Sequence, residues 1–129
     1  MKKFFKHDGS IFEPILILHG AELKRMRHPD VKGRETDIRR SVLKMETLRQ
    51  YRTILTSYET VVNYQFSFAM MKDKFTAVIT DEAQEYKTPN TKISHALKSL
   101  APKIRIACTG TPVETKLMDV WNILDFLQP

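Results

Sequence analysis

The feature that most constrains the fold of this chain is an apolar run at 75–80 that ends directly in two adjacent carboxylates, Asp81 and Glu82. β-Branched residues are frequent in the run and polar residues do not alternate with them, which is typical of a strand buried in a parallel sheet. Open α/β sheets bind their ligands beyond the carboxyl ends of the strands. We therefore expect both acids at the rim of a sheet, where one can face a magnesium ion and the other a water molecule.

A second strand-like run lies at 104–108 and ends in the loop Thr109-Gly-Thr-Pro112. Parallel strands end on the same side of a sheet, so this loop should reach the same rim as the acidic pair. The only cysteine, Cys108, falls in this run and is predicted to be a small buried core residue. Two neighbouring strand ends of this kind predict a binding site, and the acidic one is typical of a Walker B motif.

The remaining chain alternates between strand and helix patterns. Short apolar runs predict strands at 14–18 and 52–56, and the polar segment between 19 and 32 is predicted to be a turn and a loop. Apolar residues at helical spacing predict four amphipathic helices, at 34–50, from an N-cap at Ser57 to Ala69, between Thr91 and Pro102, and at 117–128 with Trp121 and Phe126 in the core. This order predicts a single α/β domain over 1–129, with about four parallel strands and helices on both faces.

Composition indicates the kind of partner. Lysine and arginine outnumber aspartate and glutamate by 21 to 15, and the resulting net charge of +6 favours polyanions such as nucleic acid. No apolar run approaches the roughly 20 residues of a membrane span, so we expect a soluble, intracellular protein without a membrane partner. The spacing of the histidines does not suggest a zinc site; these are His7, His19, His28 and His95.

Four short motifs follow one another in the chain: Leu18-His-Gly20, Leu55-Thr-Ser-Tyr-Glu-Thr60, Asp81-Glu-Ala-Gln84 with Lys87, and Thr109-Gly-Thr-Pro-Val-Glu114 with Asp119-Val-Trp121 and Phe126-Leu-Gln-Pro129. Together they resemble the Swi/Snf-type DNA-dependent ATPases of helicase superfamily two. The first is similar to the glycine turn that follows motif Ia, and the others to motifs Ib, II and III. The resemblance covers most of the chain and implies the C-terminal part of a first RecA-like lobe.

The resemblance implies an ATP-hydrolysing motor with ATP and Mg²⁺ as cofactors and double-stranded DNA as partner. Asp81 would hold Mg²⁺ through its water shell, and Glu82 would orient and deprotonate the attacking water. Gln84 would touch the γ-phosphate side or the facing lobe. The resemblance further implies a nucleotide-binding role for Thr109, Gly110 and Thr111, and a nucleic-acid-binding role for Thr56, Ser57 and Tyr58.

The chain departs from the family pattern at two places. Thr115 stands where the family commonly has asparagine, and none of the glycines at positions 9, 20, 33 and 110 precedes a lysine, so a phosphate-binding Walker A loop is missing. We therefore expect a fragment that is inactive alone and whose partners are the remainder of lobe one and the second RecA-like lobe. In the family's sheet order the missing Walker A strand lies beside 104–108, so this strand should form an exposed edge that favours self-association.

Two alternatives remain open. A basic nucleic-acid-binding module without an ATP site would account for the net charge and the missing loop, and it would bind DNA with a steep salt dependence. Another superfamily-two motor, such as a restriction-type translocase or an RNA helicase, would share part of the motifs, although Thr109-Gly-Thr-Pro112 with Asp119-Val-Trp121 argues against it.

The Swi/Snf-type motor that the resemblance implies would act in the cytoplasm or nucleoid of a bacterium, or in a eukaryotic nucleus.

Overall fold

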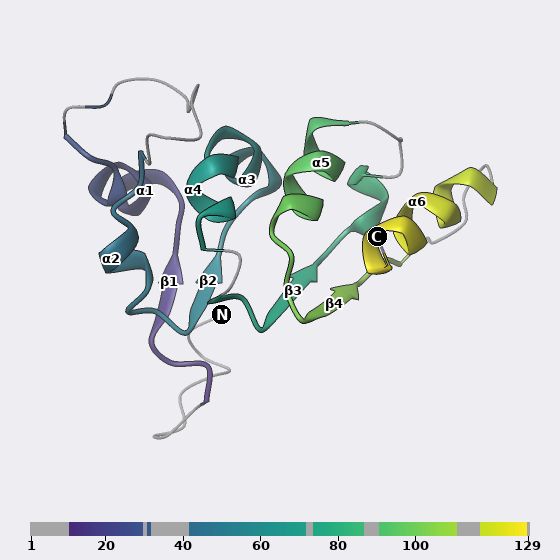
Figure 1. The fold of residues 1–129 in the computed structure, drawn as a ribbon, viewed down its shortest axis with the longest axis horizontal. Helices are drawn as coiled ribbons and strands as arrows, with labels where there is room; N and C mark the ends of the chain where they lie inside the picture. The colour runs from purple at the N-terminus through teal and green to yellow at the C-terminus, as the bar shows by residue number, and fades with distance from the viewer. Residues whose placement is uncertain are drawn as a thin grey trace.

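The computed structural model describes residues 11–29, 31, 42–71, 74–86, 91–110 and 117–128. Short strands and helices alternate along these residues (Figure 1). In chain order the elements are β1 (Ile15–Ile17), α1 (Gly20–Met26), α2 (Met45–Leu48), β2 (Thr53–Leu55), α3 (Tyr58–Asn63), α4 (Gln65–Ala69), β3 (Ala77–Thr80), the 3₁₀ helix η2 (Ala83–Tyr86), α5 (Lys92–Ser99), β4 (Ile104–Ala107) and α6 (Leu117–Leu127).

The four strands form two parallel pairs. β1 pairs with β2, and β3 pairs with β4, so that Leu16 lies opposite Ile54 and Val78 opposite Arg105. In Figure 1 the arrowheads of all four strands point toward the same side, from which α1, α3 and η2 continue. The parallel pairing and the intervening helices confirm the predicted α/β class, and they gather the carboxyl ends of the strands along one rim.

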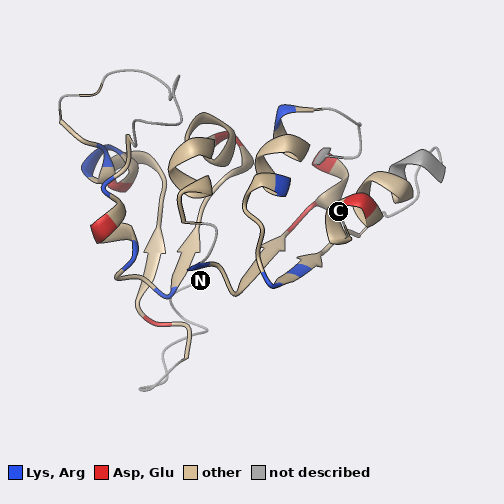
Figure 2. Ribbon diagram, in the orientation of Figure 1, with Lys and Arg blue, Asp and Glu red and all other residues tan. Residues whose placement is uncertain are grey.

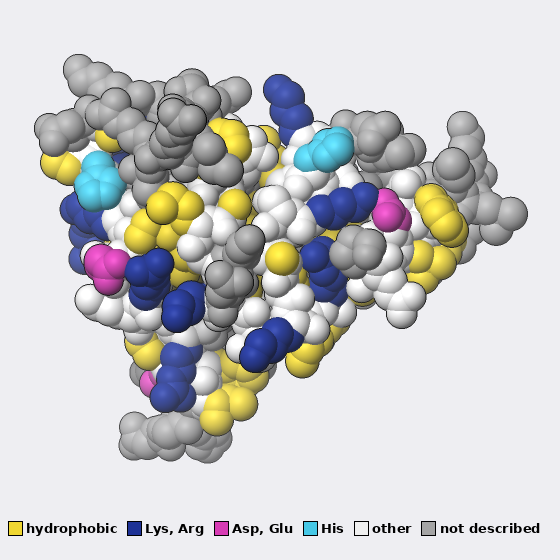
Figure 3. All heavy atoms as spheres, in the orientation of Figure 1, with side chains coloured by type: hydrophobic (Ala, Val, Ile, Leu, Met, Phe, Trp, Pro, Cys, Tyr) yellow, Lys and Arg dark blue, Asp and Glu magenta, His cyan; other side chains and the backbone are white. Residues whose placement is uncertain are grey.

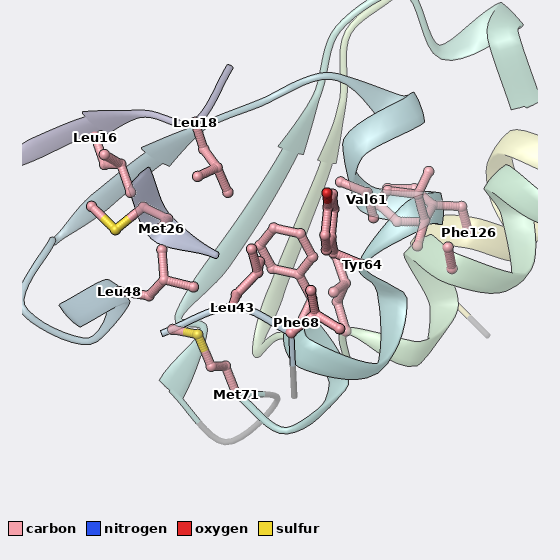
Figure 4. Packing of buried hydrophobic residues seen from close by; sticks show 14 of the residues in the cluster. Leu16, Leu18, Met26, Leu43, Leu48, Val61, Tyr64, Phe68, Met71 and Phe126 are labelled. Atoms are coloured by element: carbon pink, nitrogen blue, oxygen red, sulfur yellow. The ribbon is translucent and has the colours of Figure 1, made fainter. Parts of the chain in front are cut away.

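The hydrophobic core lies between the strands and the helices (Figure 4). Leu16 and Leu18 come from β1 and its end, Met26 from α1, and Phe68 from α4, and each is at most 3% exposed. From the C-terminal helix, Phe126 is 1% exposed and reaches the same core. Burial of these side chains is the main term that holds the helices on the strands.

The opposite face of β3 and β4 is open. Ile79, Ile104 and Ile106 are 64%, 52% and 42% exposed, whereas their neighbours Val78 and Ala107 pack against the core. Successive strand residues point to opposite faces, so the helices among the described residues lie over one face of this pair. The prediction of helices on both faces is therefore not met in this part of the chain.

Arg105 ties the last helices to β4. Its guanidinium donates hydrogen bonds to the backbone carbonyls of Phe126, at 3.2 Å, and Lys98, at 3.4 Å. Lys98 also forms an ion pair with Asp125, which joins α5 to α6 directly. Burial lowers the pKa of the Arg105 side chain, since desolvation disfavours its charged form.

Two sequence predictions in the first half were wrong. Residues 20–26 form α1 instead of a loop, and Met26 at its end is 1% exposed. Val42 and Leu43 are extended, so the helix predicted from 34 to 50 is reduced in the described residues to α2; the part from 34 to 41 lies outside them.

Contacts far away in sequence explain the extended backbone at Val42 and Leu43. The buried Ser67 hydroxyl on α4 accepts hydrogen bonds from both of their backbone N–H groups, each at 3.3 Å. The Val42 carbonyl also accepts the N–H of His28 at 2.9 Å, beside an antiparallel bridge between Arg27 and Leu43. Tertiary hydrogen bonds here replace those that a helix would have supplied.

Most helix predictions in the second half are confirmed. The predicted N-cap Ser57 accepts the backbone N–H of Thr60, and Thr91 caps α5 in the same way. The helix after Ser57 is interrupted at Tyr64, where the backbone leaves helical geometry (φ −124°, ψ 31°). Trp121 was predicted in the core but is 62% exposed.

Candidate active site

The predicted acidic pair lies at the end of β3, next to the end of β4 (Figure 2). The Cys108 N–H donates to the carbonyl of Thr80 at 2.7 Å, and the Ala83 N–H donates to the carbonyl of Cys108 at 3.0 Å. These bonds continue the parallel pairing beyond both strands. They place Thr109 beside the turn of Asp81 and Glu82, whose side chains are both exposed. Cys108 is exposed as well, so its predicted burial was wrong.

Gln84 joins the two strand ends through side chains. The Thr109 hydroxyl donates to Oε1 of Gln84 at 2.7 Å, and the amide nitrogen of Gln84 donates to Oε2 of Glu82. The sequence predicted all three as site residues, and the structure brings them into one hydrogen-bonded chain. Since each bond fixes the direction of the next side chain, the arrangement orients the Glu82 carboxylate.

The backbone at Glu82 is in an uncommon conformation. Its φ of 53° lies in the left-handed region, which costs a residue with a Cβ about 1–2 kcal/mol. The Glu82 N–H donates a hydrogen bond to Oδ1 of Asp81 at 3.0 Å. The next residue, Ala83 at the start of η2, is fully buried. Strain of this size persists where neighbouring contacts over-determine the geometry, as they do at many functional sites.

The end of β2 reaches the acidic turn from the other side. Thr56 donates through its hydroxyl to the Leu18 carbonyl at 3.1 Å, and Ser57 caps α3. The hydroxyl of Tyr58 donates to the backbone carbonyl of Asp81 at 2.5 Å. The sequence proposed Thr56, Ser57 and Tyr58 for nucleic acid and Asp81 for the nucleotide, but it gave no indication that the two segments touch.

A cavity of about 290 Å³ opens between α1 and α3 on the side of Ser57. Its lining includes His19, Lys24, Arg27, Ser57 and Asn63. Lys24 and Arg27 stand out in the sequence as part of a basic cluster, but the sequence did not reveal that they share a cavity, because 20–32 was predicted to be a loop. The spacing of Leu23 and Met26, one helical turn apart directly after a strand, was the signal that could have revealed it.

Basic side chains are spread over the face shown in Figure 3. In the cavity, the Arg27 side chain donates to the Val31 carbonyl at 3.0 Å, and its guanidinium lies 5.9 Å from the ring centre of Tyr64. Lys24 is exposed, so its ammonium is available to an anion in solvent. Glu59 also lines the cavity and offsets one of these two positive charges, so a single net positive charge remains.

Thr111 and Lys87 lie outside the described residues, so the predicted role of Thr111 stays a prediction. Within the described residues no three His, Cys, Asp or Glu side chains group together as a metal cage. The single carboxylate of Asp81 still suits Mg²⁺, which takes oxygen ligands and typically retains several waters beside one or two carboxylates and substrate phosphates.

Comparison with known proteins decides the family. A family model described as the SNF2-related domain matches residues 14–129, which is most of the chain. The chain belongs to the SNF2-related family. This confirms the resemblance to Snf2-type superfamily-two ATPases that was drawn from the motifs.

Curated relatives of this SNF2-related domain are much longer proteins. It is 34% identical over 119 residues to the Zorya protein ZorD of Escherichia coli O139:H28, an alignment that covers 90% of the chain and 11% of that protein. It is also 34% identical over 82 residues to the human TATA-binding protein-associated factor 172, covering 64% of the chain and 4% of that protein. The chain thus spans a small part of the relatives it matches.

A solved structure supports the fold. The SNF2-related domain superposes on the Sulfolobus solfataricus SWI2/SNF2 ATPase core, solved in complex with dsDNA, with a TM-score of 0.58 and 32% sequence identity. The match covers 89% of this chain and 19% of the other.

None of the helices in the described residues is long and apolar enough to span a membrane.

Proposed function

We propose that this SNF2-related domain belongs to a motor that couples ATP hydrolysis to translocation on double-stranded DNA or to remodelling of protein–DNA complexes. The observation that carries the proposal is the side-chain connection from Thr109 through Gln84 to Glu82 at the ends of β3 and β4. A carboxylate oriented in this way beside a second carboxylate suits metal-assisted hydrolysis of the terminal phosphoanhydride bond of ATP.

Asp81 and Glu82 would have different roles in hydrolysis. Asp81 would hold Mg²⁺ through water, and the ion, when bound, neutralises charge that develops on the transferred phosphoryl group. Glu82 orients the attacking water and accepts its proton, for which its fixed direction is an advantage. Gln84 keeps that direction through Thr109, and the exposed Gly110, which follows Thr109, would contact the nucleotide.

Nucleic acid would lie along the neighbouring strand ends. Thr56, Ser57 and Tyr58 precede or begin α3 at the same rim, and the cavity with Lys24 and Arg27 opens beside Ser57. Cationic side chains there suit a phosphate backbone and contribute affinity that falls as salt rises. The Sulfolobus protein was solved with dsDNA, which favours the duplex as the partner.

The 129-residue chain by itself is proposed to be inactive. Neither a Gly-Lys phosphate loop nor a second lobe occurs in its sequence, and both supply contacts that phosphoryl transfer requires. ATP and Mg²⁺ should therefore bind tightly only when the rest of lobe one is present, and turnover should need the second RecA-like lobe as well.

A matched pair of variants tests the proposal in the full-length gene product. Glu82→Gln keeps the shape of the side chain but removes the base, and it should lower DNA-dependent ATP turnover by about 10²-fold or more. Glu85→Gln removes another exposed carboxylate three residues along, in η2, and should leave turnover close to that of the wild type. Equal turnover in the two variants would exclude Glu82 as the base. An absence of ATP turnover in the wild type, with salt-sensitive DNA binding retained, would favour the basic module instead.

A further inference from the structure

The contact between Tyr58 and Asp81 joins two functional segments that are separate in sequence. Tyr58 is the first residue of α3, and its hydroxyl reaches the backbone carbonyl of Asp81 at 2.5 Å. The two residues are 23 positions apart and follow strands of different pairs, Tyr58 after β2 and Asp81 after β3. Among the hydrogen bonds described here, this one links the proposed nucleic-acid segment directly to the acidic turn.

The position of Tyr58 is set by its own helix. The Ser57 side chain caps α3 by accepting the Thr60 N–H at 3.3 Å, and the Tyr58 ring is half-buried against the core cluster. Packing therefore holds the Tyr58 ring, while its hydroxyl reaches the acidic turn. Partly buried tyrosines commonly combine an apolar ring contact with a hydrogen bond from the hydroxyl in this way. Movement of the Thr56–Tyr58 segment would accordingly move the hydroxyl.

The carbonyl that accepts this bond belongs to the peptide group between Asp81 and Glu82. Rotation of that group changes φ of Glu82, which is held at 53°, and with it the direction of the Glu82 side chain. On its other side the turn is held through Gln84 and Thr109. Tyr58 and Thr109 thus hold the same turn from two neighbouring strand ends.

We propose that Tyr58 is a positioning residue that sets the Asp81–Glu82 peptide through its hydroxyl and so links occupancy of the nucleic-acid segment to the geometry of the base. The inference rests on the proposed function and adds a role for one hydroxyl group within it. It differs from a direct contact of Tyr58 with the nucleic-acid backbone, because the hydroxyl donates to the Asp81 carbonyl.

Removal of this hydroxyl tests the inference in the full-length protein. Tyr58→Phe keeps the ring and its packing but loses the hydrogen bond, and it should lower kcat for DNA-dependent ATP hydrolysis roughly 3- to 10-fold, the effect of one lost hydrogen bond. The KM for ATP and the affinity for duplex DNA should not change. Hydrogen exchange of the backbone amides at 81–86 should become faster, because the turn loses one of the hydrogen bonds that hold it.

Tyr51→Phe is the matched control. It removes the same atom from a half-buried tyrosine before β2 whose hydroxyl forms no hydrogen bond with the described residues. It should leave kcat and the exchange of 81–86 at wild-type values. If both variants lose activity together with thermal stability, the effect is one of folding and the inference is overturned.

The remaining outcomes separate this inference from the proposed function. Unchanged kcat and unchanged exchange in Tyr58→Phe, with an active wild type, refute the role of Tyr58 and leave the motor proposal intact. Weaker DNA binding with normal exchange at 81–86 would instead assign the hydroxyl to nucleic acid and refute the inference. A wild-type protein without DNA-dependent turnover would overturn the proposed function, and this inference with it.

Discussion

The left-handed backbone at Glu82 predicts an unusual order of stability among variants. Both Glu82→Ala and Glu82→Gly delete the carboxylate and its contact with Gln84, so they differ only in the Cβ atom. At φ 53° that atom costs about 1–2 kcal/mol, whereas glycine loses about 0.4–1 kcal/mol through its freer unfolded chain. Glu82→Gly should therefore be the more stable of the two, by about 1 kcal/mol.

Glu85 supplies the control because it lies three residues away in η2 and is not among the residues with positive φ. There the ordinary order applies, and Glu85→Ala should be more stable than Glu85→Gly by roughly 0.5–1 kcal/mol. Glycine is therefore expected to be more stable than alanine at position 82 and less stable than alanine at position 85.

Urea unfolding of the 129-residue chain measures both differences. With a denaturant slope of about 2 kcal/mol/M for a domain of this size, 1 kcal/mol shifts the unfolding midpoint by roughly 0.5 M. If Glu82→Ala unfolds at the same urea concentration as Glu82→Gly, or at a higher one, Glu82 does not adopt the left-handed conformation, and the reasoning about strain at the site is wrong.

Two further predictions concern the second strand pair. Ala101 follows α5 with φ 43°, so Ala101→Gly should raise stability by about 1 kcal/mol in the same urea assay, and a loss of stability would contradict the assigned helix end. The 129-residue chain should associate as its concentration rises, because Ile104 and Ile106 are exposed on β4, which pairs with β3 alone among the described strands. Sedimentation velocity would measure this association, which Ile106→Lys should weaken; a wild-type chain that stays monomeric at high concentration would rule it out.

Local sequence patterns determined much of the second half of the chain. The run that ends in Asp81 and Glu82 was predicted as a strand with acids at its end because a buried parallel strand has a distinctive composition. The cap at Ser57 was predicted, as was the start of a helix at Thr91, since a hydroxyl that accepts an N–H three residues on is a local interaction. The motifs are likewise short local stretches of sequence, and they were sufficient to indicate the family.

The tertiary structure alone decided what depends on contacts between distant residues. Periodicity could not show that Ser67 holds Val42 and Leu43 extended, because those hydrogen bonds span 24 and 25 positions. Periodicity also could not show that Trp121 is exposed. Helical spacing identifies the apolar face of a helix but does not show which other elements cover that face. At the site, the sequence placed each residue at a strand end, whereas the connections from Thr109 to Gln84 and from Tyr58 to Asp81 arise only when parallel pairing brings those ends together.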